Sequence, residues 1–321
     1  MNFFWRKTAE NFIYALFFGL TAGIASWPTM AHAETWRVAL IGDTPYSDYE
    51  RAELPKMLDA IADRHVDLIA HIGDFKHGGD RCDDAIFEDR LRLFENSRAP
   101  FVYVPGDNEW TDCRRPSNGA YDPLERLDKL RSLFWRDGLS LGRKKMGLEK
   151  QPGEYPEHTR FRVGPVLFVT LNIPGGNNNF NKEGEPSDEF LARNPVVLNW
   201  LHENFALARQ QKLAGIALLF QANPGFTNLA MGMPQPGYRK LLEALREETL
   251  RFSGKVMVVH GDTHISRIDQ PLRDQHGQLI RHFTRVETFG YPLMGWTLVT
   301  IDSESPTLFR FETHPWPARR P

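Results

Sequence analysis

The chain has few cysteines, no excess of one charge and, beyond its N-terminus, no apolar run long enough for a membrane helix. Only Cys82 and Cys113 occur among 321 residues, which excludes a framework of several disulfides. Basic residues (39) nearly balance acidic ones (41), and the net charge of −2 offers no basic footprint for nucleic acid. Because no repeat, charge block or low-complexity linker divides the sequence, we expect residues 34–321 to form a single soluble domain.

The one pronounced apolar run lies near the N-terminus, from Phe12 to Ile24. Arg6 and Lys7 precede this run, and Ala31 to Ala33 follows it as a small-x-small site. This order is typical of a cleaved secretory signal peptide. We therefore predict that residues 1–33 are removed, that the protein is periplasmic or secreted, and that it contacts no membrane after cleavage. The alternative is an uncleaved N-terminal anchor, although the run is short for a membrane span.

Four apolar stretches end in the dipeptide Gly-Asp, and each reads as a strand that runs into a turn. A single aspartate after a strand is often only the N-cap of the next helix. Strands side by side in one sheet, however, bring their carboxyl ends to one edge, so we expect four carboxylates to converge there. Such a cluster repels itself unless cations neutralise it, which makes bound divalent metal the simplest interpretation. The stretches are Val38–Asp43, Leu68–Asp74, Phe101–Asp107 and Val256–Asp262.

The two cysteines follow the second and third of these Gly-Asp turns. If the turns share one edge of a sheet, Cys82 and Cys113 lie near each other, and an exported chain meets an oxidising environment. We therefore expect a disulfide between them, with two separate buried thiols as the alternative.

Periodicity gives a coarse architecture for the rest of the chain. Helical spacing occurs between consecutive Gly-Asp strands, which predicts two successive β-α-β units, while Pro174–Pro195, rich in Gly and Asn, reads as a long loop. Two mixed sheets packed face to face, with helices outside them, account for the order of elements. The expected helices are 54–62, 85–94, 122–135, 196–211 and 237–251, and the further strands are 161–163, 166–171, 215–220, 279–287, 296–301 and 308–312.

The four Gly-Asp motifs, with Asn108 and Glu109 after the third and Thr263 and His264 after the fourth, resemble the blocks of the calcineurin-like metallophosphoesterases in order and approximate spacing. The resemblance covers Ile41 to His264. It implies a four-layer α/β/β/α sandwich that binds two divalent metal ions, bridged by an aspartate, and hydrolyses phosphoesters.

Carried over by position, the resemblance assigns the first metal to Asp43, Asp74, His77 and His264. The usual Asp-x-His of the first block reads Asp43-Thr44-Pro45 here, so its histidine is missing. The purple acid phosphatases of this superfamily also lack it and use a tyrosine three residues after the second-block aspartate, where this chain has His77. An imidazole there could replace the phenolate, unless His77 is a solvated loop residue.

The second metal is assigned to Asp74, Asp107 and Asp262, with an amide oxygen from Gln221 or Asn223 where the family's fourth block supplies a histidine. An oxygen-only site favours Mg²⁺, Mn²⁺ or Ca²⁺ over zinc. Across both sites the expectation is two divalent ions, drawn from Mn, Mg, Fe, Zn and Ca.

The family's proton donor is also changed, because Asn108 stands where a histidine is usual and an amide cannot donate a proton in acid catalysis at neutral pH. His260, just before the last motif, is either a core residue, a partner of the site or a substitute proton donor. His71, within an apolar strand, we interpret as a core residue. Arg114, like other cations of these loops, is either solvated or binds substrate phosphate.

Three functions fit these residues, and we rank an exported metal-dependent phosphoesterase acting on a small phosphoester first. The second is a degenerate member that binds metal and ligand but turns over poorly, because Asn108 and the fourth block depart from the family pattern. The third is an interaction protein that uses the fold only as a scaffold.

Overall fold

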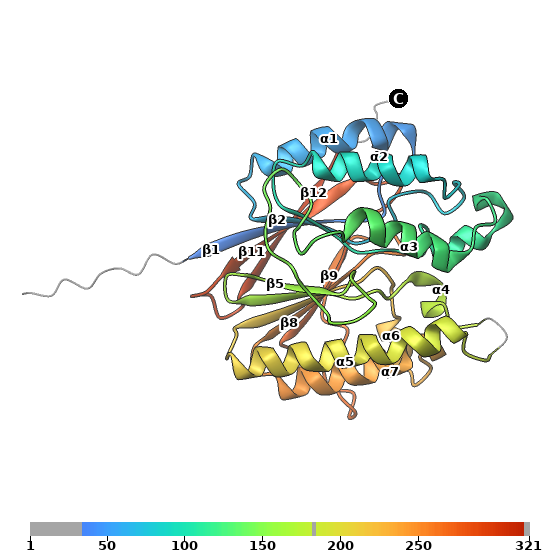
Figure 1. Cartoon of the computed structure of the whole chain (residues 1–321). Coiled ribbons are helices and arrows are strands. Elements are labelled where there is room, and N and C mark those ends of the chain that lie inside the picture. Colours follow the sequence, from blue (N-terminus) through green and yellow to red (C-terminus); the bar gives the residue numbers. More distant parts are fainter. Residues whose placement is uncertain (1–33, 182–183, 318–321) are drawn as a thin grey trace, which may run out of the picture. The chain divides into compact units, whose positions relative to one another are not determined.

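A computed structural model describes residues 34–181 and 184–317, which leaves the predicted signal peptide outside the described residues. Two β-sheets face each other, and helices cover the outer face of each (Figure 1). Both sheets mix parallel and antiparallel pairs, so the predicted α/β/β/α sandwich is confirmed. Within the described ranges, no helix is long and apolar enough to span a membrane.

The first sheet has five strands in the order β12-β11-β1-β2-β3. Strands β1, β2 and β3 run parallel, and β11 pairs with β1 in the antiparallel sense. Helices α1 and α2 make the parallel connections, which are the two β-α-β units predicted above. The elements are β1 (Thr35–Ile41), α1 (Asp48–Ala62), β2 (Leu68–His71), α2 (Asp84–Glu95), β3 (Phe101–Tyr103), β11 (Gly295–Asp302) and β12 (Phe309–Pro315).

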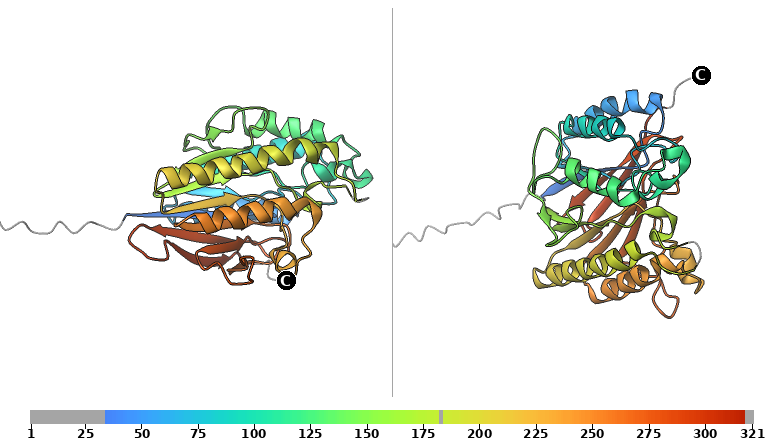
Figure 2. Two further views of the ribbon diagram at one scale, coloured as in Figure 1. Left: turned by 90° about the horizontal axis from the view of Figure 1, so that it is seen from below. Right: turned by 45° about the vertical axis from the view of Figure 1, so that its right-hand side comes forward.

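The second sheet has seven strands in the order β4-β5-β6-β7-β8-β10-β9. Its centre, from β6 to β10, is parallel, and antiparallel strands flank it on both sides. Helices α5 and α7 run beside each other along its outer face (Figure 2). The elements are β4 (Glu149–Lys150), β5 (Thr159–Val163), β6 (Val166–Thr170), α5 (Asp188–Gln210), β7 (Gly215–Leu219), α7 (Pro236–Arg251), β8 (Lys255–His260), β9 (Arg267–Asp269) and β10 (Phe283–Glu287).

Short helices lie in the connections. Helix α3 has Pro at its first position and Asp122 as its N-cap, which accepts hydrogen bonds from the backbone N–H groups of Leu124 and Glu125. These elements are η1 (Thr111–Arg114), η2 (Pro116–Asn118), α3 (Pro123–Phe134), α4 (Gly175–Asn178) and α6 (Phe226–Ala230).

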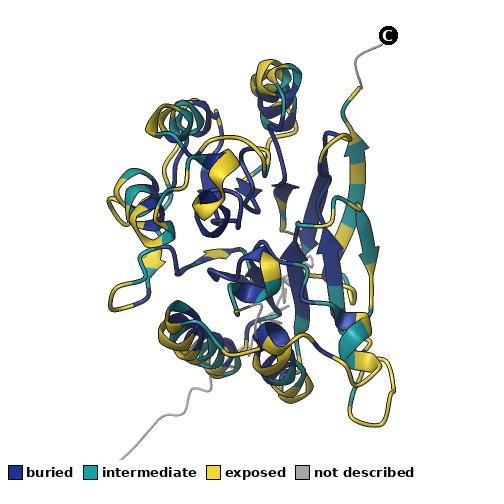
Figure 3. Ribbon diagram, turned by 90° about the vertical axis from the view of Figure 1, so that its right-hand side faces the viewer, coloured by how far each residue is buried: buried dark blue, intermediate teal, exposed yellow. Residues whose placement is uncertain are grey.

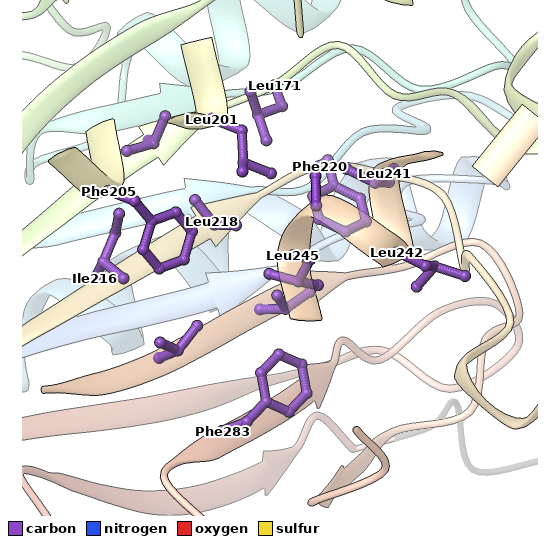
Figure 4. Close-up of a cluster of buried hydrophobic side chains, with 14 of the residues drawn as sticks. Leu171, Leu201, Phe205, Ile216, Leu218, Phe220, Leu241, Leu242, Leu245 and Phe283 are labelled. Carbon is purple, nitrogen blue, oxygen red and sulfur yellow. The ribbon is translucent and has the colours of Figure 1, made fainter. Parts of the chain in front are cut away.

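Three layers of apolar side chains hold the sandwich together, and burial is concentrated in the strands and the inner faces of the helices (Figure 3). One layer lies between α1, α2 and α3 and the first sheet. A second lies between the sheets, where Val38 and Leu40 of β1 belong to the same cluster as Phe168 of β6 and Val259 of β8. The third packs α5 and α7 on the second sheet, with Phe205 beside Ile216 and Leu218 (Figure 4).

Two sequence expectations about this architecture were wrong. The four Gly-Asp strands are not in one sheet, because β8 belongs to the seven-stranded sheet and only β1, β2 and β3 share the other. The stretch Pro174–Pro195 is not all loop, because α5 begins at Asp188. Ser187 caps this helix by accepting a hydrogen bond from the N–H of Phe190, and Pro195 lies inside it. The cap and the buried face of the helix outweigh the proline, which usually ends a helix.

Candidate functional site

The four Gly-Asp turns meet at one end of the sandwich, although they come from two sheets. The backbone N–H of Asp262, after β8, donates to the Asp43 carboxylate, after β1, at 3.0 Å. The carboxylates of Asp74 and Asp107, after β2 and β3, accept from the same amide nitrogen of Gln221, each at 3.0 Å. The convergence expected from the sequence is therefore present in the structure.

The backbone at this point is strained in a way that is rare for residues other than glycine. Asp43, Asp74, Asp262 and His264 have φ values of 48°, 57°, 78° and 58°, in the left-handed region. Such conformations cost about 1–3 kcal/mol each and persist only where the surroundings impose them, which is common at functional sites.

Three of the carboxylates are buried and that of Asp262 is partly buried, and they repel one another. Burial raises the pKa of Asp43 to about 6, although the nearby His264 opposes the shift. Burial, together with the Asp107 charge, raises the pKa of Asp74 well above its usual range. Burial and then the Asp262 charge do the same to the pKa of Asp107, and burial raises the pKa of Asp262 itself. The cluster therefore favours bound positive charge.

Protein cations do little to neutralise this cluster. His264 places its Nε2 3.5 Å from Asp43 Oδ1, and the Asp43 carboxylate raises the pKa of that imidazole. Lys76 is buried nearby, but its ammonium donates to the carbonyls of His77 and Asp80. Within the described part of the chain, no arginine or lysine forms an ion pair with any of the four aspartates.

Among the described residues, the predicted ligand His77 forms no ion pair with the four aspartates. It is exposed, and its Nδ1 accepts a hydrogen bond from the N–H of Gly79 at 3.0 Å. Its ring meets the ring of Tyr46 edge-on, with centroids 5.6 Å apart, and Tyr46 makes a similar contact with His264 at 5.3 Å. The side chain of His77 thus contacts the Gly79 N–H and the Tyr46 ring.

Asn108, expected to hold the position of the family's proton donor, is buried and fully engaged. Its amide donates to the Tyr46 hydroxyl at 2.9 Å and to the Lys76 carbonyl at 3.1 Å. Its backbone N–H donates to the Asp74 carboxylate at 3.1 Å. This side chain orders the loop around Asp74 and offers no acid.

His260, the other catalytic candidate, is fully buried behind the site. Its Nδ1 contacts the Gly261 carbonyl at 2.9 Å, and its Nε2 has no hydrogen-bond partner among the described residues. Burial lowers the pKa of His260 to about 3, so the imidazole is neutral at physiological pH. Its position is that of a core residue, one of the roles considered from the sequence, and it does not favour proton donation. His71 is likewise buried, with its Nε2 at the Thr44 carbonyl.

The candidate substrate-binding residues are dispersed. Gln221 is fully buried between two carboxylates, as described above. The Asn223 backbone N–H donates to Asp262 at 2.9 Å, and its side chain contacts Thr263. Arg114 is exposed in η1, and its guanidinium donates to Asn179. Only Asn223 borders the pocket beside the site.

That pocket has a volume of about 470 Å³ and opens next to Asp262. Its walls are rich in amide and hydroxyl groups and include the guanidinium groups of Arg267 and Arg285. Arg267 is paired with Glu287, and Arg285 with Asp269. A polar part of a ligand bound at the carboxylates would fit here.

Two residues of the site escaped the sequence reasoning. The Tyr46 hydroxyl donates to Asp74 at 3.1 Å and accepts from Asn108. One carboxylate oxygen of Glu109 accepts three hydrogen bonds, from the Tyr103 hydroxyl at 2.6 Å and from the N–H groups of Gly106 and Asp74 at 2.7 and 2.9 Å. Both residues lie within or directly after a Gly-Asp block, and that proximity was the available signal.

The expected disulfide between Cys82 and Cys113 is present, with Cα atoms 5.7 Å apart. Both sulfurs lie close to the Asn108 carbonyl, at 3.6 and 3.8 Å. The bridge therefore joins the loops that follow β2 and β3, directly behind the residue that binds Asp74.

The two parts of the site differ in how well their donor groups suit a metal ion. Asp43 and Asp262 supply two carboxylates and His264 supplies an imidazole, which is chemistry that suits a divalent cation. Asp43 accepts from the Asp262 backbone N–H, and its carboxylate lies 3.5 Å from His264 Nε2. Between Asp74 and Asp107 the Gln221 amide hydrogens already occupy one oxygen of each carboxylate. Among the described residues, no three His, Cys, Asp or Glu side chains are already arranged as a complete metal site.

Comparison with known proteins gives the chain a family. The structure is similar to a dimetal phosphatase from Danio rerio, with 14% identity over 87% of this chain and 99% of that one and a TM-score of 0.49. It is also similar to a purple acid phosphatase from yellow lupin seeds, with 13% identity over 84% of this chain and half of that one and a TM-score of 0.49. No curated protein sequence matches. The sequence model of the calcineurin-like phosphoesterases matches residues 37–266, which contain all four Gly-Asp turns, and the chain therefore belongs to that family.

Proposed function

We propose that the protein is a divalent-metal-dependent phosphoesterase that acts on a small phosphoester. The observation that carries this proposal is the set of four carboxylates, three of them buried and that of Asp262 partly buried, that meet without an arginine or lysine among the described residues to neutralise them. Burying so much like charge is costly unless a cation binds. Because the chain belongs to the calcineurin-like phosphoesterases, such a cation would serve phosphoester hydrolysis.

Asp43, Asp262 and His264 would hold the cation, with Asp74 beside them. The chemistry that such a cation supplies when bound is polarisation of the phosphoester and acidification of water. The protein's own groups orient the reactants. Glu109 fixes the turn that carries Asp74 by accepting from its backbone N–H, and Asn223 fixes the Asp262 carboxylate by donating its own backbone N–H to it. The pocket beside Asp262 would receive the rest of the substrate.

A second candidate function is favoured by Asn108. Its amide is committed to Tyr46 and to the Lys76 carbonyl, so the residue at the family's acid position cannot protonate a leaving group. A protein that binds metal and a phosphoester but hydrolyses it slowly would have this arrangement.

We also propose that the protein is exported to the periplasm or beyond. The apolar N-terminal run and its small-x-small site support this, and so does the use of both cysteines in a disulfide.

The test of function is hydrolysis of an aryl phosphate and an aryl phosphodiester by chelator-treated protein, after addition of Mn²⁺, Mg²⁺, Fe²⁺, Zn²⁺ or Ca²⁺ separately. We expect at least one ion to restore turnover. Asp43→Asn should lower the rate by more than about 100-fold, because even changing a partner of a metal ligand costs about 10- to 100-fold. Asp128→Asn, at an exposed position on α3, is the matched control and should change nothing.

Metal content measured on the same samples separates the candidates. Metal bound by the unsubstituted protein and lost in Asp43→Asn, without hydrolysis of either ester, would support the weakly active alternative. Unchanged metal content and unchanged rates in Asp43→Asn would refute both.

A further inference from the structure

Gln221 links three loops at the centre of the site. It follows β7 in the seven-stranded sheet, and its side chain reaches across to the loops of the five-stranded sheet. Its Nε2 lies 3.0 Å from Asp74 Oδ2 and 3.0 Å from Asp107 Oδ1. Its Oε1 accepts from the N–H of Gly175, after β6, at 2.6 Å. The side chain is fully buried.

The surrounding backbone leaves room for this side chain. A Cβ atom added at Gly73 would lie 2.7 Å from Gln221 Cγ, and one added at Gly106 would lie 2.8 Å from the same atom. Gly73 also has a φ of 80°, which disfavours other residues. The aliphatic part of Gln221 is therefore held between two glycines, each of which directly precedes an aspartate.

The Gln221 carboxamide has one favourable orientation between these neighbours. An amide NH₂ group has two hydrogens, and two carboxylates accept them; the amide oxygen has its own donor in Gly175. Rotating the amide by half a turn would set its oxygen against both carboxylates and its hydrogens against the Gly175 N–H. A cation that bridges Asp74 Oδ2 and Asp107 Oδ1 would have to displace the NH₂ group from both carboxylates.

We propose that the carboxamide of Gln221 takes the place of a second metal ion between Asp74 and Asp107, so that the site holds one divalent cation, on the side of Asp43, Asp262 and His264. This inference rests on the proposed function, because it assumes that the first cation binds. It differs from the two-metal site expected from the family resemblance, in which Gln221 or Asn223 offered an amide oxygen to the second ion.

The test counts bound metal in variants that remove the amide hydrogens. Gln221→Glu keeps the shape of the side chain and places a third carboxylate beside Asp74 and Asp107, while Gln221→His supplies an imidazole. With Mn²⁺ as the probe, elemental analysis and titration calorimetry should give one equivalent for the unsubstituted protein and two for each variant. Gln210→His, at an exposed position at the end of α5, is the matched control and should keep one.

Thermal unfolding provides a second readout that does not depend on activity. Gln221→Glu should lower the Tm of the chelated protein, and Mn²⁺ should raise the Tm of this variant more than that of the unsubstituted protein. Two equivalents in the unsubstituted protein, or one in both Gln221 variants, would overturn the inference and leave the proposed function intact. No Mn²⁺ bound by any of these proteins would overturn both.

Discussion

Gly106 and Gly261 each make room for an aspartate from another part of the chain. A Cβ atom at Gly106 would lie 2.1 Å from Asp74 Oδ1, and one at Gly261 would lie 2.2 Å from Asp43 Oδ2. Neither glycine has a positive φ, so the reason for glycine at these two positions is close approach and not backbone conformation. The glycine of one Gly-Asp motif thus accommodates the carboxylate of another.

The hydrogen bonds of the Tyr46 hydroxyl can be tested by removing a single oxygen atom. This hydroxyl joins Asn108 to Asp74, and both partners are buried. Tyr46→Phe removes the two hydrogen bonds, although Asn108 keeps the Lys76 carbonyl and Asp74 keeps Gln221. We expect the free energy of unfolding of the metal-free protein to fall by about 1–2 kcal/mol, measured by urea denaturation.

Tyr49→Phe is the matched control, because the Tyr49 hydroxyl donates to the Pro317 carbonyl at the surface. It should cost less than about 0.5 kcal/mol. Equal losses in the two variants would mean that the Tyr46 hydroxyl does not tie the site together.

At the scale of elements, the loops after β2 and β3 carry Asp74 and Asp107, and the disulfide holds them to each other. Cys82 and Cys113 are 31 positions apart, and a crosslink that closes a loop of this size stabilises a protein by about 4 kcal/mol in the chain-entropy model. The double variant Cys82→Ser, Cys113→Ser should lose about that amount, measured by urea denaturation without reductant.

Because the bridge lies behind Asn108, the serine variant should also bind metal more weakly. Thiol titration of the unsubstituted protein, denatured without reductant, should find no free thiol. Two free thiols, or equal stability of the two proteins, would contradict the prediction.

The regular elements were largely predictable from the sequence, because apolar period and turn residues are local signals. The helices and strands expected around the Gly-Asp motifs are present, although α1 begins at Asp48, six residues before its predicted start. The start of α5 was not predictable from local pattern, because it depends partly on Arg193. This residue is buried and donates to the carbonyls of Asn172 and Asn178 in a distant loop.

At the site, the sequence indicated which aspartates converge but not how the long side chains lie. Gln221 was interpreted as a source of an amide oxygen, whereas its nitrogen faces the carboxylates because Gly175 takes the oxygen. The sequence also did not indicate that β8 belongs to the second sheet. A buried strand is an apolar run in either sheet, so the pattern does not distinguish them.

For the whole molecule, the start of the mature chain is the open prediction. Arg6, Lys7 and the run from Phe12 to Ile24 place the cleavage after Ala33, so the exported protein should begin at Glu34. Mass spectrometry of the N-terminal peptide from the periplasm or medium checks this. Recovery of Met1, or of a peptide from Phe12 to Ile24, would exclude cleavage.

Strand β1, the first of the sandwich, pairs with β11, which is close to the C-terminal end of the sequence. The pair can therefore form only after nearly all of the chain has been synthesised. Thr35 lies opposite Asp302, and β11 comes after the region that matches the family. A ribosome therefore releases β1, β2 and β3 long before the neighbour of β1 exists. Until then the sheet that carries Asp43, Asp74 and Asp107 has an open edge able to pair with other chains. Because of this topology, the site can assemble completely only after synthesis of the chain is almost finished.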